Sequence, residues 1–312
     1  MIETRLWPPS KDRVRFYVYQ DLVEQYTTKN FTFDEDILNA FTGVMAATEP
    51  TYGPYIFGLP EGSIDIALLW VPKGETTRRG STHAGIHGLE SRTEYLIPSW
   101  SWAGWIGQVF HPLWPFRAAP EEHICILRTC LESLSIGSAN TIDKRRLVRR
   151  KDSFLPPESV MEWDTTPDVD KVATNAIILR FRTSVISHTH FNIGQECKLT
   201  IGMEVMSSTT ILDSKNQRCG VFFMGLSALT SALDRSSYQI LLMSKHERLY
   251  FRGRKSVVQY LDNPYNPNIE YSMCNVMLVQ EEEGIASRIC VGLIHVDAWN
   301  GANPQLQAIS LC

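Results

Sequence analysis

The sequence lacks the features that mark an exported or membrane-spanning protein. None of its apolar runs approaches the ~20 residues that a membrane helix needs, and the first ten residues are too poor in apolar side chains for a signal peptide. The seven cysteines include no CxxC pair, and their odd number does not fit a disulfide framework. We therefore expect a cytoplasmic protein that binds no membrane and whose cysteines are all free thiols.

The sequence also lacks the motifs of nucleotide, metal and nucleic-acid sites. Its glycines fit neither the Walker nor the dinucleotide pattern, and a net charge of -4 gives no general attraction to nucleic acid. His188 and His190 could lie on one face of a strand, as in some metal sites, but no further ligand is spaced nearby. We expect no cofactor, no metal ion and no nucleic-acid partner.

Hydrophobic periodicity predicts helices in the first part of the chain. In residues 14–29, Val14, Val18, Leu22 and Tyr26 recur every four positions and Val23 widens the stripe, which is typical of an amphipathic helix. Residues 33–48 begin with three acidic side chains, which favour a helix start, and carry a second apolar face. Residues 60–70 predict a third helix, because Pro60 is tolerated in a first helical turn.

The remainder of the chain has the pattern of strands. Residues 98–105 alternate small and aromatic side chains, which predicts a strand with Trp100 and Trp102 on one face. Seven further β-branched or aromatic runs are bounded by turn residues, at 123–130, 175–186, 197–206, 219–225, 238–244, 273–281 and 286–297. Between the last two, Gly284 can adopt the positive φ of a hairpin turn. We predict an α+β fold: N-terminal helices followed by a predominantly antiparallel β-sheet or barrel-like C-terminal part.

The domain organisation follows from a change in composition near the middle of the chain. Residues 143–170 contain the basic run 144–151, Pro156-Pro157 and several acids, which is typical of a linker. The basic run could contact phosphate, but we interpret it as solvated surface. We expect a helical region plus the Trp-rich strand segment in residues 1–142 and a β-rich region in 171–312, packed together into one unit. Residues 72–93 are expected to form a surface loop.

An ordered series of short segments resembles fungal heterokaryon-incompatibility (HET) proteins, in the region that follows their HET domain. The series contains Tyr19-Gln-Asp-Leu-Val-Glu-Gln-Tyr26, Asp36-Ile-Leu-Asn-Ala-Phe-Thr-Gly43, Phe57-Gly-Leu-Pro-Glu61, Ala67-Leu-Leu-Trp70, Pro98-Ser-Trp-Ser-Trp-Ala-Gly-Trp105, Asn275-Val-Met-Leu-Val279 and Arg288-Ile-Cys-Val-Gly-Leu-Ile-His-Val-Asp-Ala-Trp299. Order and spacing agree as well, so the resemblance spans almost the whole chain.

The resemblance implies a non-catalytic interaction or regulatory region with an unknown protein partner. Its family is associated with non-self recognition and programmed cell death after fusion of unlike cells. The Trp-Ile-Asp, Cys-Ile-Asn-Gln and Trp-x-Leu-Gln-Glu type segments of the HET domain do not occur in this sequence. We therefore expect Met1 to mark a truncated product, a gene-model error or a diverged remnant, and the HET domain's activity is not assigned to this chain.

Two alternatives assign a site to the chain itself. A small hydrolase would use Cys290 or Cys274 as nucleophile, with His295 and Asp297 facing the same side of a predicted strand. A ligand-binding β-module would use the indoles of Trp100, Trp102 and Trp105. We expect these tryptophans to fill the core instead, as for Trp70 and Trp299, because paired aromatics on one strand face usually pack in a sheet interior.

Overall fold

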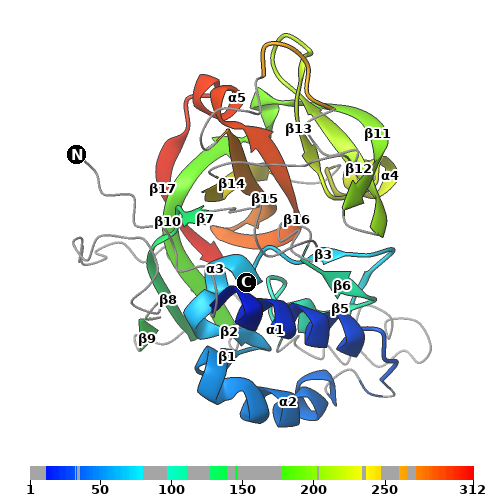
Figure 1. The fold of residues 1–312 in the computed structure, drawn as a ribbon. Coiled ribbons are helices and arrows are strands. Elements are labelled where there is room, and N and C mark those ends of the chain that lie inside the picture. Colours follow the sequence, from blue (N-terminus) through cyan, green and yellow to red (C-terminus); the bar gives the residue numbers. More distant parts are fainter. Residues whose placement is uncertain are drawn as a thin grey trace, which may run out of the picture.

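The computed structural model describes residues 12–31, 33, 36–79, 97–111, 127–138, 145–146, 177–201, 204–233, 237–246, 260–265 and 272–312. Helices and short β-ribbons of the N-terminal part lie at the base of Figure 1, below a large sheet. The helical elements are α1 (Asp12–Tyr26), α2 (Asp36–Tyr52), η1 (Glu61–Ser63), α3 (Ile64–Ala67), η3 (Trp102–Gly104), η4 (His188–His190), α4 (Leu226–Leu233) and α5 (Val296–Gly301). The predicted α+β class is confirmed.

The first two predicted helices are present, but the buried face of α1 overlaps only partly with the face that its periodicity indicates. Phe16, Tyr19 and Val23 are buried, whereas Val18 is 47% exposed. The buried stripe has the spacing i, i+3 and i+7; of the predicted stripe, Val23 belongs to it and Tyr26 packs partly buried against the core. Large rings bury more apolar area than valine does, so they decide which face turns inward.

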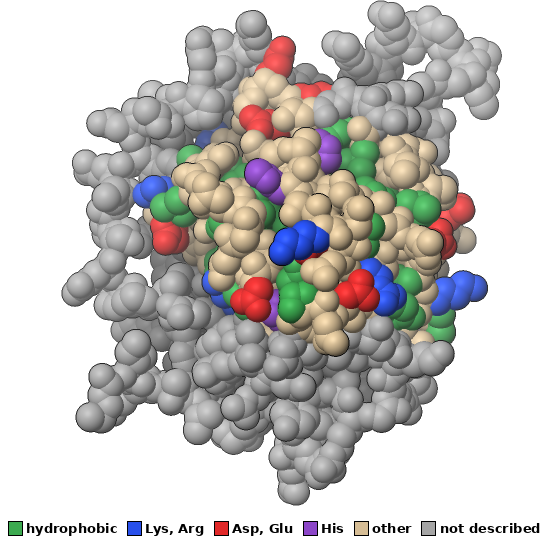
Figure 2. All heavy atoms as spheres, turned by 90° about the horizontal axis from the view of Figure 1, so that it is seen from above, with side chains coloured by type: hydrophobic (Ala, Val, Ile, Leu, Met, Phe, Trp, Pro, Cys, Tyr) green, Lys and Arg blue, Asp and Glu red, His purple; other side chains and the backbone are tan. Residues whose placement is uncertain are grey.

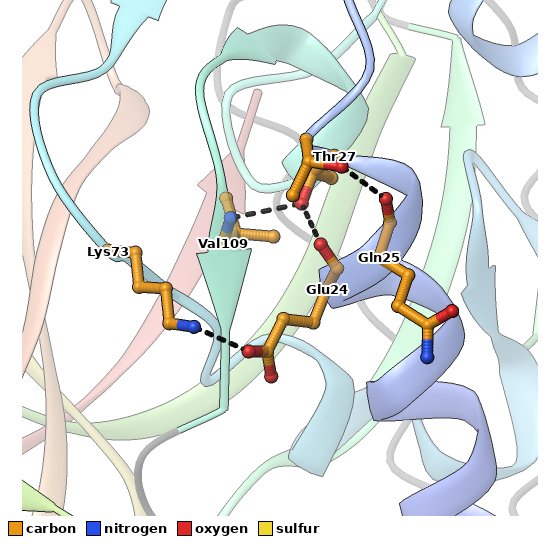
Figure 3. A network of polar contacts seen from close by, with 6 residues as sticks. Glu24, Gln25, Thr27, Lys73 and Val109 are labelled. Carbon is orange, nitrogen blue, oxygen red and sulfur yellow. Dashed lines mark hydrogen bonds and ion pairs between the residues drawn. The ribbon is translucent and has the colours of Figure 1, made fainter. Parts of the chain in front are cut away.

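The end of α1 is fastened to the ribbon formed by β3 (Val71–Pro72) and β6 (Val109–Phe110) (Figure 3). The Thr27 hydroxyl donates to the Glu24 carbonyl at 3.3 Å and accepts the Val109 amide at 3.1 Å. Lys73 pairs with the Glu24 carboxylate at 2.6 Å, and both side chains are largely buried. A helix terminus leaves backbone groups without intrahelical partners, and these contacts fix where α1 stops against the ribbon.

The third predicted helix is much shorter than residues 60–70. Only η1 and the single turn α3 are helical; Leu59–Pro60 forms strand β2, which pairs with β1 (Tyr55–Ile56), and β3 begins at Val71. Helices this short gain little from their own hydrogen bonds. The free carbonyls at the end of α3 instead bind a side chain of the large sheet, as described below.

The large sheet contains most of the described strands, and nearly all of its strand pairings are antiparallel. Its eleven described strands are β7 (Leu127–Thr129), β8 (Glu132–Ser138), β9 (Arg145–Arg146), β10 (Ile177–Ser187), β11 (Asn192–Ile201), β12 (Glu204–Leu212), β13 (Arg218–Phe222), β14 (Ser237–His246), β15 (Met273–Glu282), β16 (Ile285–His295) and β17 (Gln305–Leu311). The predicted run 197–206 is not one strand, because it crosses from β11 into β12.

Five of these strands close into a ring, which gives the sheet its barrel-like character. The pairings run β16–β15–β14–β10–β17, and a parallel contact between Ala286 and Leu311 joins β17 back to β16. The amide of Cys312 adds a 2.8 Å hydrogen bond to the Ala286 carbonyl. Closure removes unpaired strand edges, which would otherwise expose backbone donors and acceptors.

Two apolar clusters cover opposite faces of the sheet. One face belongs to the same core cluster as the helices, through Phe181, Val185, Leu241, Met277, Val291 and Ile309. The alternate residues Ile240, Leu278 and Cys290 join a second cluster that contains the buried Trp299 of α5. Because successive side chains of a strand point to opposite faces, β14–β16 contribute side chains to both clusters and are buried on both sides.

The hairpin between β15 and β16 is the one the sequence predicts. Glu283 and Gly284 at its tip have φ values of 50° and 79°. Two consecutive residues in the left-handed region match the twist of the flanking strands, which is the geometry of the common two-residue hairpin turn. Register follows from this turn, since Glu282 pairs directly with Ile285.

The expected domain boundaries lie mostly outside the described residues. Of the expected linker, 143–170, only Arg145–Arg146 is described, and residues 80–93 of the expected surface loop are not. Strands β7 and β8 precede the linker yet pair with β14 and β10. One core cluster also contains side chains from α1, α2 and the ring.

Among the described helices, none is both long and apolar enough to cross a bilayer. Six of the seven cysteines lie in the described part of the chain, and all six are free thiols, as the spacing predicts. Cys125 lies outside it.

Candidate functional site

The Trp-rich segment that carries much of the resemblance is not a strand. Residues 98–101 form a turn, Trp102–Gly104 is a 3-10 turn, and only Trp105–Ile106 pairs as β5 with β4 (Thr77–Arg78). Ser101 caps the 3-10 turn by accepting the Ala103 amide at 3.0 Å. The side chain of Ser101 also donates to the Phe57 carbonyl at 2.7 Å. These side-chain bonds replace the ladder that a strand would need.

Trp100 and Trp102 are both fully buried, whereas Trp105 is half-buried. The Trp102 indole donates to the Tyr19 hydroxyl at 3.1 Å, and that hydroxyl donates to the Gly58 carbonyl at 2.9 Å. Burial raises the pKa of Tyr19 well above its ordinary value, so the phenol keeps its proton. Trp100 and Trp102 therefore fill the core, and the structure does not present them as the lining of an open ligand groove.

Gly58 is the position where Trp102 comes closest to the backbone. Its φ is +82°, and a Cβ added there would lie 2.7 Å from Cζ2 of Trp102. We expect Gly58→Ala to lower the free energy of unfolding by ~2–4 kcal/mol, through left-handed strain and overpacking together. Gly53→Ala is the matched control, because its φ is +77° and nothing lies within 4 Å of the added Cβ. It should cost only ~1 kcal/mol. If urea unfolding shows the same loss of free energy of unfolding for both variants, the close contact between Gly58 and Trp102 is contradicted.

Two arginines of the preceding segment hold the Trp-rich turn in place. Arg78 donates to the Gly104 carbonyl at 2.6 Å and to the Ile97 carbonyl, and its guanidinium lies 5.5 Å from the Trp105 ring centroid. Arg79 Nε donates to the Ala103 carbonyl at 3.0 Å. A guanidinium carries five donors in a rigid fork, so one side chain can satisfy several carbonyls of a turn.

Arg288 of β16 joins the sheet to the helical part. Its guanidinium lies 3.7 Å from the Trp70 ring centroid and donates to the Leu68 carbonyl at 2.6 Å and to the Trp70 carbonyl. Its backbone amide donates to the Ser99 hydroxyl at 3.0 Å, and that hydroxyl donates to the carbonyl of Cys312. Burial lowers the pKa of Arg288 to about 9, so the group is charged at neutral pH. No described carboxylate pairs with it; carbonyl dipoles and the indole face take that role.

The segments that carry the resemblance thus meet at one buried junction, formed by Gly58, Trp70, Trp100, Trp102 and Arg288. No protein-family model, curated protein or solved structure matches the chain. Membership of the HET family stays a prediction carried by the quoted segments.

His111 lies beside this junction as a buried neutral imidazole. Its Nε2 is 3.2 Å from the Ala67 carbonyl, which can only accept, and its Nδ1 has no hydrogen-bond partner. The ring meets Phe16 edge-on at 5.5 Å between centroids. Burial, with a smaller contribution from the Arg288 charge, lowers the pKa of His111 from 6.5 to about 3. The folded protein therefore resists protonation of this group.

The low pKa of His111 predicts that the folded protein loses stability in acid. Its pKa is lower in the folded than in the unfolded chain, so its contribution is present above about pH 6.5 and is lost as pH falls toward 3. Between pH 7 and pH 5 we expect it to remove ~2 kcal/mol from the free energy of unfolding. His111→Gln should keep a donor while abolishing this share of the pH dependence. Urea unfolding of the wild type and of His111→Gln at pH 7 and pH 5 measures this difference. If both proteins lose the same free energy of unfolding between the two pH values, His111 is not responsible.

Of the proposed hydrolase residues, His295 and Asp297 lie together, with Nδ1 of His295 3.6 Å from Oδ2 of Asp297, but Cys290 does not lie beside them. Strand β16 ends at His295, and Asp297 lies in the first turn of α5, so the prediction that both face one side of a strand was wrong. The fully buried His295 caps α5, its Nδ1 accepting the Asp297 amide at 3.2 Å. Cys290 is five residues away along an extended strand, about 16 Å. Burial raises the pKa of both the Cys290 and the Cys274 thiols to about 12, which keeps them protonated and poorly nucleophilic.

His188 and His190 lie in the 3-10 turn η4, not in a strand as the spacing suggested. Ser187 caps this turn by accepting the Thr189 amide, and His188 Nδ1 is 3.3 Å from the Tyr238 carbonyl. Within the described residues no three His, Cys, Asp or Glu side chains are grouped to hold a metal ion. Figure 2 looks onto the end of the molecule that carries α5, where described side chains of both charges are scattered among neutral ones rather than gathered by sign.

Sequence reasoning missed Arg78 and Arg288. Arg288 had one visible signal: it is a lone cation in an otherwise apolar strand segment that is part of the resemblance. A charged residue that interrupts such a run is either at an exposed position or buried with partners, and only the structure shows which.

Proposed function

We propose that this chain is a non-catalytic interaction region of a HET-family protein that acts in fungal non-self recognition. One observation carries the proposal: the segments that resemble the family converge on a single buried junction rather than on an exposed catalytic group. When related proteins share segments because these segments make the same buried contacts, the shared segments define a common fold. The surface of that fold would then contact the partner protein.

The state of the candidate nucleophiles supports a role without catalysis by the C-terminal sheet. Nucleophilic catalysis needs a thiolate or an activated hydroxyl, with a base within hydrogen-bond reach. Cys290 and Cys274 are protonated thiols, and the His295 Nδ1 is occupied as a helix cap. The geometry therefore favours an interaction region over the hydrolase alternative.

Expression in a fungal host tests the proposal. Residues 1–312 alone are expected to cause neither cell death nor loss of NAD, whereas the same residues fused behind a HET domain from a related protein should permit triggered death. A matched fusion with Trp102→Ala distinguishes a folded interaction region from an inert tail, because it should lose the response. Death or NAD loss caused by the short chain alone would overturn the proposal, as would full activity of the Trp102→Ala fusion.

A further inference from the structure

Three polar side chains lie next to one another on one face of the large sheet. The strand register pairs Arg180 of β10 with Ser135 of β8 on one side and with Ser310 of β17 on the other. Directly paired residues of neighbouring strands point to the same face, with Cβ atoms about 4.5–5.5 Å apart. Leu179 and Phe181 belong to the core cluster, so the Ser-Arg-Ser row points to the opposite face.

Arg180, the cation in this row, is buried, and the described residues give it no counter-charge. Arg180 is 8% exposed, and its Nη1 has no hydrogen-bond partner. Burial alone lowers the pKa of its guanidinium, and no carboxylate in the described part of the chain pairs with it. Arg288 is also buried, at 4% exposed, but two carbonyls and an indole satisfy it. An unpaired buried charge is costly, so Arg180 lacks a partner that its position calls for.

The two serines offer the hydroxyls that such a partner would need. Ser310 is buried and Ser135 is half-buried, and within the described contacts neither hydroxyl makes a hydrogen bond. Arg146, in the basic run of residues 144–151, occupies the register position next to Ser135. Arg182 lies two residues along β10, where the register position across β8 is the acidic Glu132, whereas Arg180 has a serine on each side. Arg180 is therefore the cation that lies between the two serines, with Arg146 at the next register position of the row.

We propose that Arg180, Ser135 and Ser310 form a binding site for a phosphate group. A guanidinium presents parallel N–H donors that match the spacing of phosphate oxygens, and phosphate supplies the missing negative charge. Three donors from three strands suit an anion with three or more oxygens, whereas a carboxylate offers only two. The site lies on rigid strands of the ring, so its donors are fixed before the anion binds.

Titration of the full chain with inorganic phosphate tests the site, by calorimetry and by thermal melting against sodium chloride at equal ionic strength. Phosphate should raise the melting temperature of the wild type beyond the effect of chloride. Arg180→Gln should weaken phosphate binding at least tenfold, and the Ser135→Ala/Ser310→Ala double variant should weaken it three- to tenfold. Arg182→Gln, on the same strand, should change it less than threefold.

Arg180→Gln should also melt no lower than the wild type without phosphate, because it removes an unpaired buried charge. If that variant fails to fold, the double serine variant decides, since hydroxyl removal leaves the strands intact. An equal response of wild type and Arg180→Gln to phosphate would overturn the site, as would a wild type that responds only as it does to chloride. Acetate acting as strongly as phosphate at equal ionic strength would overturn the phosphate assignment.

Discussion

Replacing Trp102 with alanine is expected to lower the free energy of unfolding by ~3–5 kcal/mol, a large part of the stability of a typical domain. The indole is fully buried, contacts Phe41 edge-on at 5.1 Å between centroids and donates to Tyr19. Its removal leaves a cavity beside Gly58, and the Tyr19 hydroxyl loses the hydrogen bond that it accepts, while it keeps the one that it donates to the Gly58 carbonyl. Equilibrium urea unfolding, followed by circular dichroism, measures the loss.

Phe33→Ala serves as the control for Trp102→Ala, since Phe33 is 59% exposed and should cost less than ~1 kcal/mol. A Trp102→Ala protein that unfolds like the wild type but loses binding of a partner or ligand would contradict the core assignment. It would restore the interpretation of the tryptophans as a ligand groove.

Replacing Arg288 with alanine is expected to cost ~3–5 kcal/mol, because two buried carbonyls lose charge-assisted hydrogen bonds and Trp70 loses its stacking partner. Arg288→Lys should lose most of this as well. An ammonium group keeps the charge but cannot bridge two carbonyls while lying flat on an indole. Thermal and urea unfolding of the two variants gives both values.

Arg288→Met separates the contribution of the clamp from that of the aliphatic stem. The methionine fills much of the stem's volume but leaves the Leu68 and Trp70 carbonyls unpaired, so we expect a loss of at least ~2 kcal/mol. Replacing buried ionic groups with apolar ones is neutral in some proteins. A loss below ~1 kcal/mol here would show that the carbonyl contacts do not hold the two parts together.

The elements that could be predicted are those whose pattern is local. The first two helices and most of the long strands follow from periodicity, and the β15–β16 hairpin follows from Gly284 at its tip. The Trp-rich segment could not be predicted this way. Its alternation has the period of a strand, but its carbonyls are taken by Arg78 and Arg79 of another segment.

The candidate site was predicted only in part. The burial of Trp100 and Trp102 was expected and is confirmed. His295 and Asp297 do lie together, with Nδ1 3.6 Å from Oδ2, but not across a strand face as predicted, because the strand ends at His295, where the imidazole caps α5. The strand stops two residues before its predicted end at 297, which changes how the two side chains meet, and periodicity does not locate element ends that closely.

The sequence by itself determined the α+β class, the order of helices before strands and the absence of paired cysteine spacing, because each depends on composition or on neighbours within a few residues. Only the tertiary structure decided that Arg288 bonds to the Leu68 carbonyl, 220 residues away, and that Arg180 lies between two serines. The first contact arises where the helical part packs against β16, and the second from the register of β10 against β8 and β17. A side chain's partners are then set by strands far apart along the chain, which no local pattern encodes.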